Sequence, residues 1–169
     1  AGAATMVRHL IDCGHRAIVH VEGPEGNVEA ADRARGYAQA MEAAGLNPVI
    51  LPGNFDEESG RRAVERLQAE QVDVDAIFAA NDMMAIGVMV ALRDLGVDVP
   101  TQVAVAGFDN IPLARLISPG LTTMAVDIAD MGARGINRLV ALIDGEAVPQ
   151  MELRQPGLII RTSSQLSAA

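Results

Sequence analysis

The stretch from Asp75 to Gly96, DAIFAANDMMAIGVMVALRDLG, decides the fold of this chain. It begins with a short apolar run, residues 76–80, which has the length and character of a strand buried on both faces. The polar pair Asn81-Asp82 follows, and residues 83–95 then favour a helix that ends at Gly96. A strand, a polar turn and a helix make half of a βαβ unit, in which ligands bind at the carboxyl end of the strand.

Two interpretations of the polar pair are open from this stretch alone. In the first, the Asn81 amide faces a ligand while Asp82 caps the helix behind it. In the second, both residues only cap the helix and turn the chain. The choice depends on what the rest of the chain places at the same edge of the sheet.

Helix-like segments and short apolar runs alternate along most of the chain. Further strands are predicted at residues 17–21, 48–51 and 103–107, and further helices at residues 2–13, 28–44 and 56–71. This alternation predicts an α/β fold with a parallel sheet and helices on both faces. The final part suggests two lobes joined by several crossovers, because it adds a strand, a helix and a strand at 121–126, 128–144 and 152–160. Residues 162–169 are small and polar, and we expect them to fray.

The composition excludes several classes of function. The net charge is -9 and the chain contains no lysine, so we expect no nucleic-acid binding by these residues alone. The single cysteine, Cys13, excludes an internal disulfide and fits a reducing, cytoplasmic location. No apolar run approaches the roughly 18 residues that a membrane span needs. The amino-terminal residues also lack the basic segment of a signal peptide.

Sequence motifs for catalysis, metal binding and phosphate binding are absent. His9 and Cys13 are four residues apart on one predicted helix, but no C-x-x-C or H-E-x-x-H spacing accompanies them, and we predict no metal site. There is no G-x-S-x-G nucleophile motif, and residues 23–26 have neither G-x-G-x-x-G nor G-K-[ST]. We therefore predict no catalytic residue, no cofactor and no enzyme activity.

Four other side chains are predicted to meet at the carboxyl edge of the sheet. Phe55, Asn81 and Asp109 follow three different strands, and Arg33 lies in the second turn of the helix after the first strand. A guanidinium, an amide, a carboxylate and a ring suit a polyol, because planar polar groups bond hydroxyls in pairs and a ring stacks on a sugar. The same set would also hold a purine or a small acid.

Three of these residues have plainer interpretations as well. Arg33 can pair with Glu29 or Asp32 on a solvated helix face. Phe55 can be a residue at the edge of the core, and Asp109 can be a turn residue.

The helix at residues 83–95 has almost no polar face. One side must cover the sheet, while the other side would be exposed in a monomer, which indicates a partner surface. The alternative is burial of this side under the adjacent loop, residues 111–120.

Five segments, in order and at matching spacing, resemble the effector-binding core of bacterial transcription regulators of the lactose-repressor (LacI/GalR) family. They are GAA with HLIDCGHR in residues 2–16, DRARGY at 32–37, GNFDEESG at 53–60, AANDMMAIG at 79–87, and VAGFDNIP with PGLTT in residues 105–123. The resemblance covers practically the whole chain.

The resemblance implies a periplasmic-binding-protein-like fold, with two α/β lobes and the effector in the cleft between them. Residues 17–109 with 150–163 would form the carboxyl-side lobe, and residues 2–13 with 121–145 part of the amino-side lobe. We expect the family's headpiece and most of its amino-side lobe to be missing, so that this chain is a fragment of a larger regulator.

The resemblance also assigns roles to residues. Arg33 matches the family's ligand-binding arginine, Phe55 the ring that stacks on the effector, and Asn81 and Asp109 its polar contacts. Asn54 stands where an aspartate is common, which leaves the identity of the effector open. The homodimer contact of the family corresponds to Met83, Ile86, Met89, Val90, Leu113, Leu116 and Ile117.

The implied function is the sensing of a small effector, a sugar or a related molecule. Closure of the cleft on this effector would control DNA binding, and operator DNA would be reached only through the missing headpiece. No membrane partner is implied. The second interpretation is a periplasmic solute-binding protein of a sugar transporter, and a third is a sugar-modifying enzyme on a Rossmann-like sheet.

Overall fold

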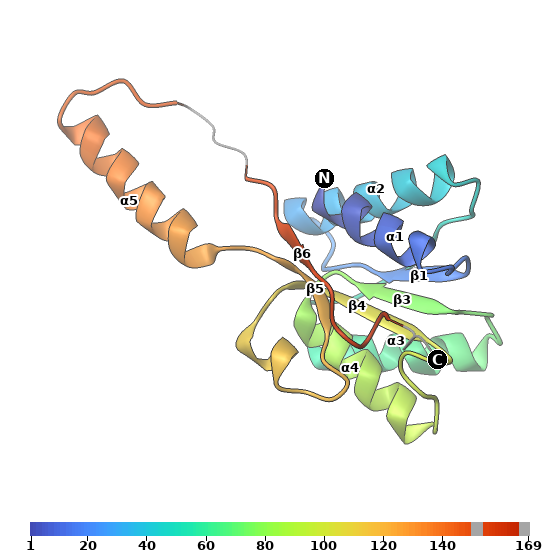
Figure 1. Ribbon diagram of the computed structural model, residues 1–169. Coiled ribbons are helices and arrows are strands. Elements are labelled where there is room, and N and C mark those ends of the chain that lie inside the picture. Colours follow the sequence, from blue (N-terminus) through green and yellow to red (C-terminus); the bar gives the residue numbers. More distant parts are fainter. Residues whose placement is uncertain (150–153, 166–169) are drawn as a thin grey trace.

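Helices cover both faces of one central sheet in the computed structural model, which describes residues 1–149 and 154–165 (Figure 1). The strand order is β2-β1-β3-β4-β5-β6; β1 to β5 are parallel, and β6 is antiparallel to β5. The strands are β1 Ile18–Val21, β2 Val49–Leu51, β3 Ala76–Ala79, β4 Ala104–Asp109, β5 Thr122–Ala125 and β6 Gly157–Ile159. The helices are α1 Gly2–Asp12, α2 Val28–Ala43, α3 Glu57–Ala69, α4 Asp82–Asp94 and α5 Ile128–Ile143, with a 3-10 helix, η1, at Pro112–Arg115.

A separate hydrophobic core lies on each face of the sheet. On one face, Met6 of α1 and Tyr37 of α2 pack in the same cluster as Phe78 of β3. On the other face, α3 and α4 cover the sheet, and Val88 of α4 shares a cluster with Ile77 of β3. Successive strand residues point to opposite faces, so β1 and β3 are buried on both sides, as their apolar sequences predict. The predicted α/β sheet with helices on both faces is confirmed.

The two helices on the second face, α3 and α4, approach each other through glycine. A Cβ atom at Gly87 of α4 would collide with the backbone carbonyl of Glu57, and one at Gly60 of α3 would collide with that of Met84. Backbone therefore packs on backbone here. The contact fixes the start of α3, and with it the loop that carries Phe55, against the first turns of α4.

The division into lobes that we predicted differs from this arrangement in two segments. Helix α1 packs on the sheet beside α2, and Met6, Val7 and Leu10 are buried there. Strand β5 pairs with β4 and extends the same sheet. Residues 2–12 and 122–125 thus belong to the body that residues 17–109 form. Residues 150–153 of the predicted carboxyl-side lobe lie outside the described residues.

Helix α5 stands away from the sheet (Figure 1). None of its residues is buried, although its sequence is strongly amphipathic. Its exposed apolar side chains include Ile136 (65%), Leu139 (58%) and Ile143 (76%). The assignment of this helix to an amino-side lobe stays a prediction.

The segment after β6 differs from the expected frayed end. Ser163 and Ser164 are fully buried. The Ser163 hydroxyl donates to the carbonyl of Val105 at 2.6 Å and accepts the amide of Thr122 at 2.8 Å, so this segment joins the starts of β4 and β5. Residues 166–169 lie outside the described residues.

Candidate functional site

All four predicted ligand-binding residues lie at the carboxyl edge of the sheet. Arg33 comes from α2, Phe55 from the loop between β2 and α3, and Asp109 from the end of β4. A guanidinium nitrogen of Arg33 lies 3.4 Å from the Asp109 carboxylate. The guanidinium carbon lies 5.8 Å from the centre of the Phe55 ring. The solvated-helix alternative for Arg33 is wrong, because only 17% of its side chain is exposed.

Arg33 is held by backbone and by a ring that was not predicted as part of the site. Its second guanidinium nitrogen donates to the carbonyl of Ala80 at 2.6 Å. The Phe108 ring lies beneath the guanidinium, 4.1 Å from its carbon atom, which is a close cation–π contact. The sequence signal for Phe108 was its place directly before Asp109 in a chain with few aromatic residues.

The charges of Arg33 and Asp109 depend on each other. Burial raises the pKa of the Asp109 carboxyl, and the neighbouring Arg33 opposes this shift. Burial lowers the pKa of Arg33, and Asp109, Glu29 and Asp82 oppose that shift. A partly buried ion pair of this kind has unused hydrogen-bonding capacity on both partners, which a polar ligand can take up.

Asn81 takes the capping role that we predicted for Asp82. Its side-chain oxygen accepts the amide of Met84 at 2.9 Å and so caps α4. Its side-chain nitrogen donates to the backbone carbonyl of Phe55 at 2.9 Å. Phe55 has φ 62, a left-handed conformation that is uncommon for a residue other than glycine. Asn81 thus holds the backbone of Phe55, and its contact with a ligand stays a prediction.

Asp82 is buried instead of capping the helix. One carboxylate oxygen accepts the hydroxyl of Thr123 at 2.6 Å, and the other accepts the amide of Ile111 at 2.8 Å. Burial raises the pKa of Asp82 to about 6, although both hydrogen bonds lower it. The prediction that Asp82 caps α4 is wrong by one residue, since the cap is Asn81. Asn and Asp are both good capping residues, so the sequence alone did not show which of the two precedes the first residue of the helix.

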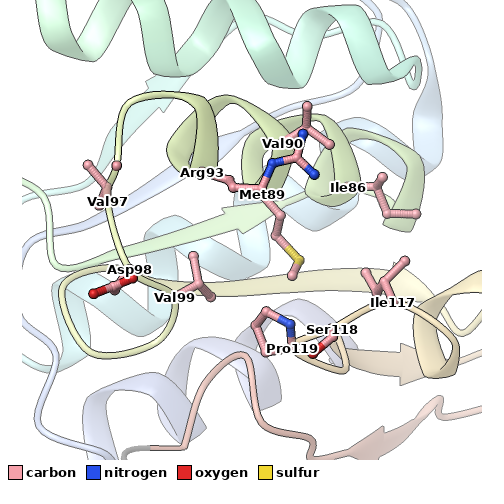
Figure 2. A pocket seen from close by; sticks show the side chains of 11 residues that line it. Ile86, Met89, Val90, Arg93, Val97, Asp98, Val99, Ile117, Ser118 and Pro119 are labelled. Carbon is pink, nitrogen blue, oxygen red and sulfur yellow. The ribbon is translucent and has the colours of Figure 1, made fainter.

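A hollow lies beside α4, and Arg33 is not among the residues that line it. It has a volume of about 370 Å³ and lies between the end of α4, the following loop and residues 117–119. Figure 2 shows Met89 extending toward Pro119, with Val99 and Ile117 on either side. We name it the α4 groove. The four predicted ligand-binding residues do not line this groove, and a hollow around them stays a prediction.

The α4 groove contains four of the seven residues that were predicted to contact a second subunit, Ile86, Met89, Val90 and Ile117. Met83 is half-buried on the same helix. Leu113 and Leu116, in and just after η1, are 41% and 70% exposed. Ile86 and Val90 of α4 and Ile117 of the loop at residues 111–120 are half-buried.

The described residues contain neither a cluster of potential metal ligands nor a membrane-spanning helix. These residues contain no group of three or more His, Cys, Asp or Glu side chains that could hold a metal ion. Across the same residues, every helix is too short or too polar to span a bilayer.

A mostly parallel sheet with helices on both faces, and a charged and aromatic cluster at its carboxyl edge, defines the class of ligand-binding α/β domains. Residues 7–164 match the family of periplasmic binding protein-like domains, and the chain belongs to this family. The predicted resemblance to the lactose-repressor family is confirmed, because the relatives and neighbours of the chain are repressors of that family.

The chain spans about half the length of the curated relatives it matches. One is a ribose operon repressor of Halalkalibacterium halodurans, 29% identical over 98% of this chain and 50% of the repressor. The structure resembles a lac repressor dimer bound to operator and an anti-inducer, with a TM-score of 0.93 and 28% identity over 98% of this chain and 50% of that one. It also resembles the transcriptional regulator CelR in complex with cellobiose, with a TM-score of 0.89 and 34% identity over 96% of this chain and 51% of that one.

Proposed function

We propose that this chain is part of the effector-sensing domain of a bacterial transcription regulator, that it acts in the cytoplasm, and that it is not an enzyme. The observation that carries the proposal is the cluster of Arg33, Phe55 and Asp109 at the carboxyl edge of the sheet. One of the similar proteins is a CelR–cellobiose complex, which supports a sugar as the class of effector.

The chemistry of the cluster suits a sugar. The Asp109 carboxylate accepts hydrogen bonds from hydroxyl groups, and the Arg33 guanidinium donates to hydroxyl oxygens. The Phe55 ring offers an apolar face for stacking. Asn81 keeps one amide hydrogen beyond the one it donates to Phe55, and we propose that this hydrogen contacts the effector.

The proposed regulator acts as a homodimer and binds operator DNA through a separate segment. The similar lac repressor structure is a dimer on operator DNA. With a net charge of -9, these residues do not supply the phosphate contacts themselves. Effector binding would close the cleft and change the affinity for DNA by favouring one arrangement of the lobes.

Calorimetry on the intact protein tests the effector site, with cellobiose and ribose as probes. We expect Arg33→Ala and Asp109→Ala to weaken binding at least ~100-fold, because each leaves a partly buried charged partner without its ion pair. Arg35→Ala is the matched control, since Arg35 is 63% exposed and pairs with Asp32 at the surface. Equal affinity in all three variants, in a protein that binds one of the sugars, would overturn the site.

A further inference from the structure

Two fully buried polar side chains, Asp82 of α4 and Thr123 of β5, lie directly behind the candidate site. The hydroxyl of Thr123 donates to one Asp82 oxygen at 2.6 Å. The other Asp82 oxygen accepts the amide of Ile111 at 2.8 Å, and the Thr123 hydroxyl oxygen accepts the amide of Asn110 at 3.3 Å. The two side chains therefore satisfy two consecutive backbone amides of the turn after β4.

This turn has a backbone conformation that needs support. Asp109 has φ 108 and Asn110 has φ 57, and neither residue is glycine. Left-handed conformations of such residues cost conformational energy and persist where the surroundings hold them. Arg161 supplies one further contact, from its guanidinium to the Asn110 side-chain oxygen at 2.8 Å.

The neighbouring strand is shaped for the Asp82 carboxylate. A Cβ atom at Gly107 of β4 would collide with an Asp82 oxygen, so only glycine leaves room for the carboxylate against β4. Because Gly107 has no side chain, the Asp82 carboxylate can pack against β4. From there it bonds to Thr123 of β5 and to the amide of Ile111 in the turn.

We propose that Asp82 and Thr123 form a clamp that holds the turn at residues 109–111 and so positions the Asp109 carboxylate toward Arg33 and the effector. Both are positioning residues, because the effector is bound by the other side chains. The part of this inference that concerns the effector rests on the proposed function. The part that concerns the turn does not, since the turn and its hydrogen bonds belong to the unliganded protein.

The clamp also joins the candidate site to the α4 groove. Asp82 lies in the first turn of α4, and Ile86 and Val90 of the same helix line the groove. Ile111 directly precedes η1, which leads to Ile117 on the other wall. One pair of side chains thereby links the turn of the candidate site to both walls of the groove.

Amide hydrogen exchange, followed by NMR on the intact protein without ligand, tests the clamp. Thr123→Val keeps the volume of the side chain but removes the hydroxyl, and we expect exchange at Asn110 and Ile111 to become at least ~10-fold faster. Thr123→Ser is the matched control and should keep the exchange rates of the wild type, because it retains the hydroxyl. Amides of β3 report whether each variant is folded.

A second variant covers the case in which Thr123→Val does not fold. Asp82→Asn keeps the size of the side chain but leaves a single acceptor oxygen for two donors, so exchange at one of the two amides should again accelerate. Unchanged exchange at both amides in the folded variants would overturn the clamp.

Calorimetry with cellobiose and ribose tests the positioning of Asp109. We expect Thr123→Val to weaken binding at least ~10-fold, with Thr123→Ser restoring it. Full affinity in a valine variant whose turn exchanges faster would overturn the positioning role. A wild type that binds neither sugar, together with faster exchange in the valine variant, would contradict the proposed effectors and support the clamp.

Discussion

His20 is a fully buried histidine of β1 in the middle of the sheet. Its ring stacks on Phe78 and Tyr37, with centroid distances of 4.8 and 5.1 Å, and its Nδ1–H donates to the carbonyl of Phe78 at 2.8 Å. Its Nε2 atom has no hydrogen-bond partner within the described part of the chain. Burial lowers the pKa of His20 from 6.5 to about 4, although the hydrogen bond to Phe78 raises it.

This lowered pKa predicts a loss of stability in mild acid. The unfolded chain takes up the proton first, so the free energy of unfolding falls as the pH decreases from 6.5 toward 4. We expect His20 to account for a loss of roughly 2 to 3 kcal/mol between pH 7 and 4.5. Asp82 contributes with the opposite sign, because its raised pKa of about 6 makes the folded state the better proton acceptor.

Urea unfolding of the wild type and of His20→Gln across this pH range isolates the histidine, since Asp82 is common to both. The difference in unfolding free energy between the two proteins should change by the stated amount as the pH falls. A difference that stays constant with pH would show that His20 is not the group responsible.

The residues of the candidate site were predictable to different degrees. Arg33, Phe55 and Asp109 follow from the rule that the carboxyl ends of parallel strands share an edge. The roles of Asn81 and Asp82 did not follow from this rule. A shift of one residue in the start of α4 decides which of the two caps the helix, and the rule does not specify that start. The position of Phe108 under Arg33 depends on side-chain packing between β4 and α2, which sequence pattern does not specify.

At the scale of elements, the contact of α3 with α4 depends on glycine. We expect Gly87→Ala to lower the free energy of unfolding by about 2 kcal/mol or more, because its Cβ collides with the carbonyl of Glu57, a backbone atom that cannot move away cheaply. In a helix interior without such contact, alanine is favoured over glycine by about 0.5 to 1 kcal/mol. Gly87→Ala should therefore destabilise the protein, although helix propensity alone would predict that it stabilises it.

Gly132→Ala in α5 is the matched control, because no atom lies within 4 Å of the Cβ that it adds. Urea unfolding monitored by circular dichroism should show no loss of stability for this variant. A Gly87→Ala protein as stable as Gly132→Ala would mean that α3 and α4 can separate without cost.

The elements themselves were predictable from periodicity and capping, whereas their placement was only partly so. The strands and helices lie near the expected positions because apolar runs and αL glycines such as Gly45 and Gly96 mark their limits. The packing of α1 on the main sheet was not expected. The sequence shows that α1 has an apolar face, but it does not specify which element that face packs against. The burial of Ser163 and Ser164 depends on hydrogen bonds to β4 and β5. A run of small polar residues does not predict such bonds, because it is equally typical of an exposed chain end.

At the scale of the whole molecule, exposed apolar side chains gather in two places among the described residues. One is α5, which stands away from the sheet. The other comprises the α4 groove and the exposed leucines of the η1 region, Leu113 and Leu116. Exposed apolar side chains that gather on a folded domain are typical of an interface, and we propose that a second copy of the chain covers the surface of α4 and η1.

Leu116→Glu tests this assignment in sedimentation experiments on the intact protein. The side chain is 70% exposed, so the substitution should leave the fold unchanged, but it would place a charge in the apolar contact. We expect the dimer to dissociate at least ~10-fold more readily. Val28→Glu is the matched control, because Val28 is 71% exposed at the start of α2, on another part of the surface. Equal dissociation of both variants would place the dimer contact elsewhere, and a wild type that stays monomeric at high concentration would contradict the dimer.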